Sequence, residues 1–176
     1  YEPMSRHTTL RVGGPAPYWL EPHSFEALAA VVHYGRQNQL PIRVIGRGSN
    51  LLVRDGGIPG IVIHPVKGAC SKIEVLEDNQ IEAGAGARFK AVTGAARGAE
   101  IGGFEWMEGI PGNVGGGLRM NAGAMGTTTF DQVVSVKYLD WETSKIVDKD
   151  GNDFNCQYRN VPALTNNIAI SAVLRG

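Results

Sequence analysis

The densest cluster of glycines in the chain covers residues 109–123, with the sequence GIPGNVGGGLRMNAG. Glycine has no side chain, so a ligand can approach the backbone amides closely, although each glycine costs conformational entropy when the chain folds. Pro111 favours the start of a short helix, whose first amides would be free for an anion. The segment therefore predicts a binding site for phosphate groups and flat rings.

A flexible spacer is the alternative interpretation of this segment, and Gly115 to Gly117 alone would favour it. Spacers, however, are rich in serine, proline and charged residues. Here apolar residues interleave with the glycines and precede them: Phe104, Trp106, Met107, Ile110, Val114, Leu118 and Met120. We therefore favour an ordered segment that binds a ligand.

A second glycine-rich turn, GRGSNLLV at residues 46–53, follows directly on an apolar run at 42–45 that predicts a strand. A glycine turn after a strand is where α/β folds bind phosphate. The third glycine of a dinucleotide fingerprint would fall on Leu51 here and on Phe89 after Gly84-Ala85-Gly86, and no P-loop sequence follows any turn. Ser49 and Asn50 also favour an ordinary turn, but their position after a strand favours binding.

Hydrophobic periodicity predicts the elements that position these turns. Ser24 is placed to cap a helix that ends near residues 37–38 and leads to the strand at 42–45. The other predicted elements are a strand at 60–64, a hairpin of 72–77 with 80–83, a helix at 88–100, a hairpin of 132–139 with 146–148, and a strand at 168–174. We expect an α+β (α/β) fold with a small α/β lobe at 1–66 and a larger α+β lobe at 67–176.

The composition is that of a compact protein, with 43% hydrophobic residues and 17 basic against 17 acidic residues. The balanced charge, without a basic run, argues against nucleic acid or an anionic membrane as a partner. No apolar stretch approaches the length of a transmembrane helix, so we expect a cytoplasmic protein. Cys70, Cys156 and the four histidines lack metal-binding spacing, which predicts buried thiols and no metal site.

Together these motifs resemble those of a known flavoenzyme family. GRGSNLLV at 46–53, GIPG at 109–112, RMNAGAMG at 119–126 and YR at 158–159 have the order and spacing of the UDP-N-acetylenolpyruvoylglucosamine reductase (MurB) family. TLRVGGPA at 9–16 is similar to the start of that family, so the resemblance spans the chain. It implies a two-lobed FAD-binding fold of the vanillyl-alcohol-oxidase (PCMH) type. Three positions depart from the family pattern: Thr8, Asn113 and Gly117.

The resemblance also implies roles for individual residues. FAD would lie between the lobes without a covalent bond, with its pyrophosphate on the amides of residues 46–50. Arg159 would be catalytic, stabilising the charge that develops on the substrate carboxylate, and Tyr158 and Arg119 would line the substrate cleft. The residues implied in cofactor binding are Gly46, Arg47, Gly48, Ser49, Asn50, Leu51, Gly109, Ile110, Pro111, Gly112, Asn113, Gly115, Gly116, Asn121 and Gly123.

The family uses NADPH to reduce the enolpyruvyl group of a UDP-sugar, giving UDP-N-acetylmuramate for peptidoglycan synthesis, which underlies cell-wall biogenesis, cell shape and cell division. By this resemblance the chain is the FAD-binding portion, a monomer whose partner is the UDP-sugar. We expect the C-terminal substrate domain, with its serine proton donor and glutamate, to be absent from the chain, which would leave the fragment not fully active. Two alternatives stay open: another FAD-dependent oxidoreductase of the same fold, and a module that holds FAD without chemistry.

Overall fold

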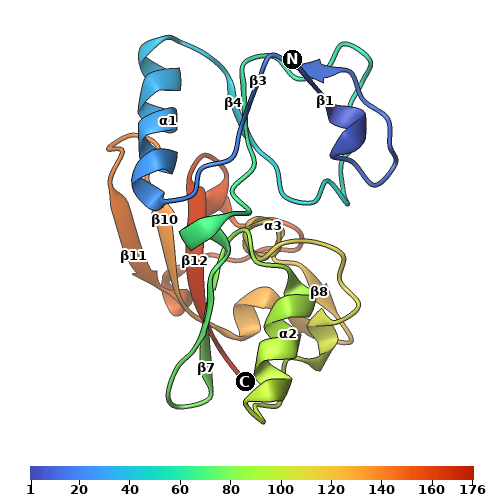
Figure 1. Cartoon of the computed structure of the whole chain (residues 1–176). Helices are drawn as coiled ribbons and strands as arrows, with labels where there is room; N and C mark the ends of the chain where they lie inside the picture. Colours follow the sequence, from blue (N-terminus) through green and yellow to red (C-terminus); the bar gives the residue numbers. More distant parts are fainter.

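The protein is described by a computed structural model that covers residues 1–176. A three-stranded parallel sheet lies in an N-terminal lobe, and a five-stranded antiparallel sheet lies in a larger lobe (Figure 1). The chain passes from the first sheet to the second between β5 (Ile61–Ile63) and β6 (Ile73–Val75). The N-terminus and the C-terminus lie at opposite ends of the molecule (Figure 1).

The N-terminal sheet has the order β3-β5-β4, with β3 at Tyr18–Leu20 and β4 at Ile42–Val44. Helix α1 (Phe25–Gln37) begins where predicted, because the Ser24 hydroxyl accepts a hydrogen bond from the Ala27 amide at 3.2 Å. The predicted strands at 42–45 and 60–64 are also confirmed. Strand β3 was not predicted, although it is as long as β4 and β5, because Pro17 and Pro22 on either side of it are typical of a loop.

The larger sheet has the order β11-β10-β12-β7-β6, and both predicted hairpins and the last predicted strand are confirmed. Its further strands are β7 (Gln80–Gly84), β10 (Val133–Leu139), β11 (Ile146–Asp150) and β12 (Ile168–Arg175). Two helices, α2 (Phe89–Gly98) and α3 (Val114–Met120), pack on one face of this sheet. Phe89 and Leu118 from these helices join Ile81 and Leu174 from the sheet in the largest apolar core of the protein.

Short elements complete the chain. Strand β1 (Glu2–Pro3) pairs with β2 (Pro15–Ala16), and β8 (Gly123–Ala124) pairs with β9 (Thr127–Thr128). The 3-10 helices are η1 (Met4–Arg6), η2 (Gly68–Ser71), η3 (Glu105–Met107), η4 (Thr129–Asp131), η5 (Gly151–Asp153) and η6 (Pro162–Leu164). No helix combines the length and the apolar character that crossing a bilayer requires.

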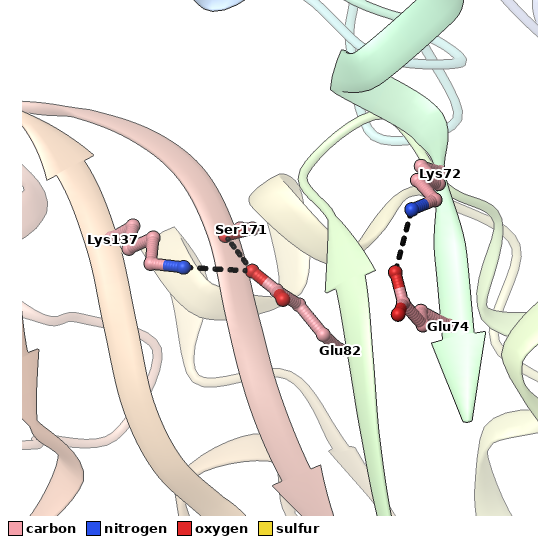
Figure 2. A network of polar contacts seen from close by, with 5 residues as sticks. All are labelled: Lys72, Glu74, Glu82, Lys137 and Ser171. Atoms are coloured by element: carbon pink, nitrogen blue, oxygen red, sulfur yellow. Dashed lines mark hydrogen bonds and ion pairs between the residues drawn. The ribbon is translucent and has the colours of Figure 1, made fainter. Parts of the chain in front are cut away.

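The face of the large sheet that α2 and α3 leave uncovered carries a polar network. Glu82 alternates with buried Ile81 and Ala83 on β7, so its side chain lies on the other side of the strand. Figure 2 shows Glu82 Oε1 accepting hydrogen bonds from Lys137 on β10 at 3.1 Å and from Ser171 on β12 at 3.0 Å. These contacts tie three neighbouring strands together, but the partly exposed ion pair contributes little stability.

The two lobes share an apolar core. Leu28, Ile61 and Ile63 from the N-terminal lobe pack in one cluster with Leu139 and Ile168 from the large sheet. The lobes are therefore held together by buried side chains, and a site between them has walls that are fixed before any ligand binds.

Candidate functional site

A cavity of about 430 Å³ lies between the two lobes. The N-terminal lobe contributes Val44 and Gly46 to its walls, and the larger lobe contributes Gly116, Arg119 and Trp141. The remaining lining residues are Ile42, Arg43, Pro65, Val66, Ala85, Gly86, Asn113, Gly115, Leu164, Thr165, Asn166, Asn167, Ile168 and Ala169. Residues of both predicted glycine segments thus line one cavity.

The two glycine segments are joined directly by hydrogen bonds. The Arg47 amide donates to Asn113 Oδ1 at 2.8 Å, and the Ser49 hydroxyl donates to the carbonyl oxygen of Pro111. Asn113 is only 5% exposed, and its Nδ2 donates to the carbonyl oxygen of Gly86. The buried Asn113 carboxamide and the Ser49 hydroxyl therefore set the distance between the turn at 46–50 and the larger lobe.

The turn at 46–50 presents a group of unpaired backbone donors. The amides of Gly46, Gly48, Ser49 and Asn50 donate to no protein acceptor, and only the Arg47 amide is used. Gly48 has φ +64, the left-handed conformation that glycine adopts without cost, and a Cβ there would collide with the carbonyl of His7. Successive free amides in such a turn form a concave site for an anion.

The predicted helix start at Pro111 is wrong, because α3 begins three residues later at Val114. Gly112 and Asn113 run extended beside Arg88, and the Gly112 carbonyl accepts from the Phe89 amide. The amides of Val114 and Gly115 donate to the carbonyls of Ala87 at 2.9 Å and Ala85 at 2.7 Å, so they are not free for an anion.

The glycines near α3 fall into two groups. A Cβ on Gly109 or Gly116 would meet no atom within 4 Å, and one on Gly112 would meet only Ser49 Oγ at 3.7 Å. A Cβ on Gly115 would lie 2.9 Å from the Ala85 Cβ, and one on Gly117 would overlap the Phe89 ring. The first group leaves space for a ligand, and the second lets α3 pack closely on its neighbours.

Several predicted cofactor residues lie outside the cavity lining. Asn121 ends α3 with φ +41, and its Oδ1 accepts a hydrogen bond from the Phe130 amide at 3.1 Å. Gly123 pairs with Thr128 in the β8–β9 ribbon. Ile110 packs against the large core, and Leu51 lies beyond the turn with 37% exposure. Their roles toward the cofactor stay predictions.

The Tyr158–Arg159 pair lies in a tight turn closed by Gln157 and Asn160. Arg159 has φ +57, its guanidinium lies 5.4 Å from the centre of the Tyr158 ring, and Tyr158 is 89% exposed. Arg119 Nη1 donates to Asn160 Oδ1 at 3.2 Å. The structure therefore connects α3, at the wall of the cavity, to the turn that carries the predicted catalytic arginine.

Sequence reasoning missed part of the cavity. Trp141 and residues 164–167 carry no motif, and only the packing of the β10–β11 turn against the segment before β12 brings them to the site. Ile168 and Ala169 were predicted only as the start of a strand. Gly86 had a signal, the Gly84-Ala85-Gly86 turn after a strand, although it fits no nucleotide fingerprint. Asn160 follows the YR pair and has no signal of its own.

The thiols lie outside the cavity. Cys70 is buried and Cys156 is partly buried, and burial raises the pKa of both thiols. No three side chains of His, Cys, Asp or Glu are grouped so that they could hold a metal ion.

Comparison with known proteins identifies the kind of domain. The family model described as "FAD binding domain" matches residues 16–149. The chain belongs to the FAD binding domain family. Over 174 residues it is 39% identical to the UDP-N-acetylenolpyruvoylglucosamine reductase of Pelobacter propionicus, covering 99% of this chain and 58% of that relative. This FAD-binding domain thus spans little more than half the length of that reductase.

Solved structures agree with this placement. The crystal structure of MurB from Thermus caldophilus superimposes with a TM-score of 0.82 at 29% identity, covering 99% of this chain and 60% of that one. Cholesterol oxidase from Brevibacterium sterolicum, at 15% identity and a TM-score of 0.65 over 99% of this chain and 36% of its own, shares the fold alone. The predicted fold class and the predicted resemblance to the MurB family are confirmed.

Proposed function

We propose that this chain is the FAD-binding portion of an NADPH-dependent reductase that converts UDP-N-acetylglucosamine enolpyruvate to UDP-N-acetylmuramate for peptidoglycan synthesis. The observation that carries the proposal is the group of unpaired amides at 46–50, beside a cavity between the lobes of an FAD-binding domain. The substrate assignment is supported by similarity over 99% of the chain to a reductase named for that enolpyruvyl sugar.

The residues present fit FAD. The free amides of Gly46, Gly48, Ser49 and Asn50 suit the two charges of its pyrophosphate. The cavity offers apolar walls for a ring system at Ile42, Val66, Trp141 and Ile168, and it offers open backbone at Gly116. FAD, when bound, supplies the capacity to accept and pass on a hydride.

The charged side chains suit an anionic substrate. Arg159 is exposed and has no carboxylate within 4.0 Å, so its guanidinium is available for two charge-assisted hydrogen bonds to the substrate carboxylate. Stabilising the negative charge that develops there lowers the barrier. Arg119 is oriented by Asn160 and lies between the cavity and the turn, where it would add positive charge.

The first test is a flavin titration of this chain. We expect FAD to bind and to give the chain flavin absorbance, and an FMN titration to give weaker binding because FMN lacks the pyrophosphate. A chain that binds neither FAD nor FMN would contradict the proposal, because the proposed activity requires bound FAD.

The second test measures NADPH oxidation that depends on the UDP-sugar, with this chain extended to the length of its relatives. Arg159→Ala should lower kcat by about 10²-fold or more, the usual effect of losing one stabilising donor, whereas Arg97→Ala on the outer part of α2 should leave it unchanged. Flavin binding without sugar-dependent oxidation would favour one of the two alternatives, a different oxidoreductase or a module without chemistry. The cytoplasmic location, the monomeric state and the choice of NADPH stay predictions.

A further inference from the structure

A second cavity, of about 570 Å³, adjoins the first. Four residues line both cavities and so form the wall between them: Gly46, Val66, Gly86 and Asn113. The other walls differ: η1, η2 and the start of α2 enclose the second cavity, and neither α3 nor the turn at 158–159 contributes to it.

The lining of this second cavity is strongly cationic. Arg6 from η1, Arg47 from the glycine turn and Arg88 before α2 all line it, and no Asp or Glu does. The imidazoles of His7 and His64 line it as polar groups. Arg47 and Arg88 have no carboxylate within 4.0 Å, whereas Glu2 Oε1 lies 3.9 Å from Arg6 Nη1 and 2.9 Å from His7 Nε2. The chain as a whole has 17 basic and 17 acidic residues and so no net charge. Three arginines around one cavity therefore concentrate positive potential there.

Backbone donors reinforce the charge. Helix α2 has 10 residues, and its N-terminal end faces this cavity through Arg88 and Ala91. The amides of Arg88 and Lys90 donate to no protein acceptor, and the helix dipole adds positive potential at this end.

The histidines are held in place by their neighbours. The His7 ring stacks on Trp19 at 3.8 Å, and the His64 ring lies 4.8 Å from the same tryptophan. His64 Nδ1 lies 2.9 Å from the carbonyl oxygen of Ile45, which can only accept, so Nδ1 carries the proton. The cavity therefore has prearranged polar walls.

We propose that this cavity binds a small phosphate-bearing anion at a site separate from the flavin cavity. Guanidinium groups pair with phosphate oxygens in two-point contacts, and three of them with a helix N-terminus match a multiply charged anion better than a single carboxylate. Only 4 of the 15 lining residues are hydrophobic, so the site suits the anion itself rather than a nucleoside attached to it.

The test is a calorimetric titration of inorganic pyrophosphate into the FAD-saturated chain at 0.15 M salt. We expect binding, with Arg88→Gln raising the Kd about 10-fold or more, the value of one charge-assisted hydrogen bond. Arg97→Gln is the matched control, because Arg97 lies on the same helix outside this cavity, and it should leave the Kd unchanged. Arg6→Gln should also weaken binding, and it tests the site independently of α2.

Other results would overturn the proposal. The first is that pyrophosphate does not bind to the FAD-saturated chain. The second is that Arg88→Gln and Arg97→Gln give equal Kd values for pyrophosphate. The third is that FAD abolishes pyrophosphate binding, which would assign the anion to the turn at 46–50. Citrate binding as tightly as pyrophosphate would overturn the phosphate class. Flavin absorbance in the same samples reports separately whether the flavin proposal holds.

Discussion

Asn113 is the side chain on which the geometry of the site depends most. Its carboxamide accepts from the Arg47 amide and donates to the Gly86 carbonyl, and it is buried in the wall between the two cavities. We predicted it as a cofactor ligand, whereas the structure uses both of its polar atoms within the protein. Its contribution to FAD binding would then be indirect, through the position of the turn at 46–50.

Asn113→Ala should therefore lower both stability and FAD affinity. Leaving the buried Gly86 carbonyl unpaired costs about 1–3 kcal/mol, and the freed turn would have to be ordered again when FAD binds. Chemical denaturation of the flavin-free chain and a flavin titration measure the two effects. Unchanged FAD affinity in a folded variant would contradict the positioning role.

Gly116 and Gly117 are neighbours with opposite expectations. Gly116→Val should weaken FAD binding about 10-fold or more while the flavin-free chain melts at an unchanged temperature, because the side chain enters open space beside the cavity. Gly117→Ala is the control, and it should lower the melting temperature, because its Cβ overlaps the Phe89 ring. Equal FAD affinity for Gly116→Val and the unmodified chain would remove α3 from the cofactor site.

His64 should make stability depend on pH. Burial lowers the pKa of its imidazole below the ordinary value of 6.5. As the pH falls below about 6.5, the unfolded chain therefore takes up this proton before the folded chain does, and the free energy of unfolding decreases. His64→Gln should reduce the loss of stability between pH 7.5 and pH 5.5 in urea denaturation. A loss of stability that is equal in His64→Gln and in the unmodified chain would contradict this role.

At the scale of elements, α3 depends on its neighbours. A helix of 7 residues with three glycines has little intrinsic stability. Backbone bonds to Ala85 and Ala87, together with Phe89 packed against Gly117, hold it in place. The connection between β7 and α2, which carries Ala85 and Ala87, and Phe89 at the start of α2 thus position the cavity wall.

The β6–β7 hairpin offers a direct test of turn chemistry. Asp78 and Asn79 both have positive φ, 54 and 57, and the Gln80 amide donates to the Glu77 carbonyl at 3.1 Å, which describes a type I′ turn. Asn79→Val should destabilise the chain by roughly 1–2 kcal/mol, because a β-branched residue resists the left-handed conformation. Asn79→Gly should leave stability equal or higher in the same denaturation experiment. Equal values for the two variants would exclude this turn type.

At the scale of the whole molecule, two lobes with a shared core lie on either side of the cavity that we propose for FAD, the flavin cavity. None of the residues that line the flavin cavity is a histidine, a cysteine or a tyrosine, the side chains that could bond covalently to FAD. His7 and His64 line the other cavity, and both cysteines lie elsewhere.

FAD should therefore be released intact when the loaded protein is precipitated with acid. The expected result is yellow supernatant and a colourless pellet, quantified by the flavin absorbance of each. Colour that stays with the denatured protein would show a covalent bond and would contradict this reading of the cavity.

The sequence by itself determined the elements whose hydrophobic residues repeat with a clear period. It also determined the turns whose backbone conformation requires a particular residue type. The capped helix α1, both hairpins and the two glycine segments are local features, because propensity and backbone freedom act within a few residues. The motif order also determined the family.

Only the tertiary structure decided which of these residues share a cavity. The start of α3 moved from Pro111 to Val114 because the chain around Asn113 pairs with Arg88, 25 positions earlier in the sequence. Trp141, Asn160 and the second, cationic cavity also depend on contacts between segments far apart in the chain. Such contacts arise when the lobes pack, and no local pattern of residue types encodes them.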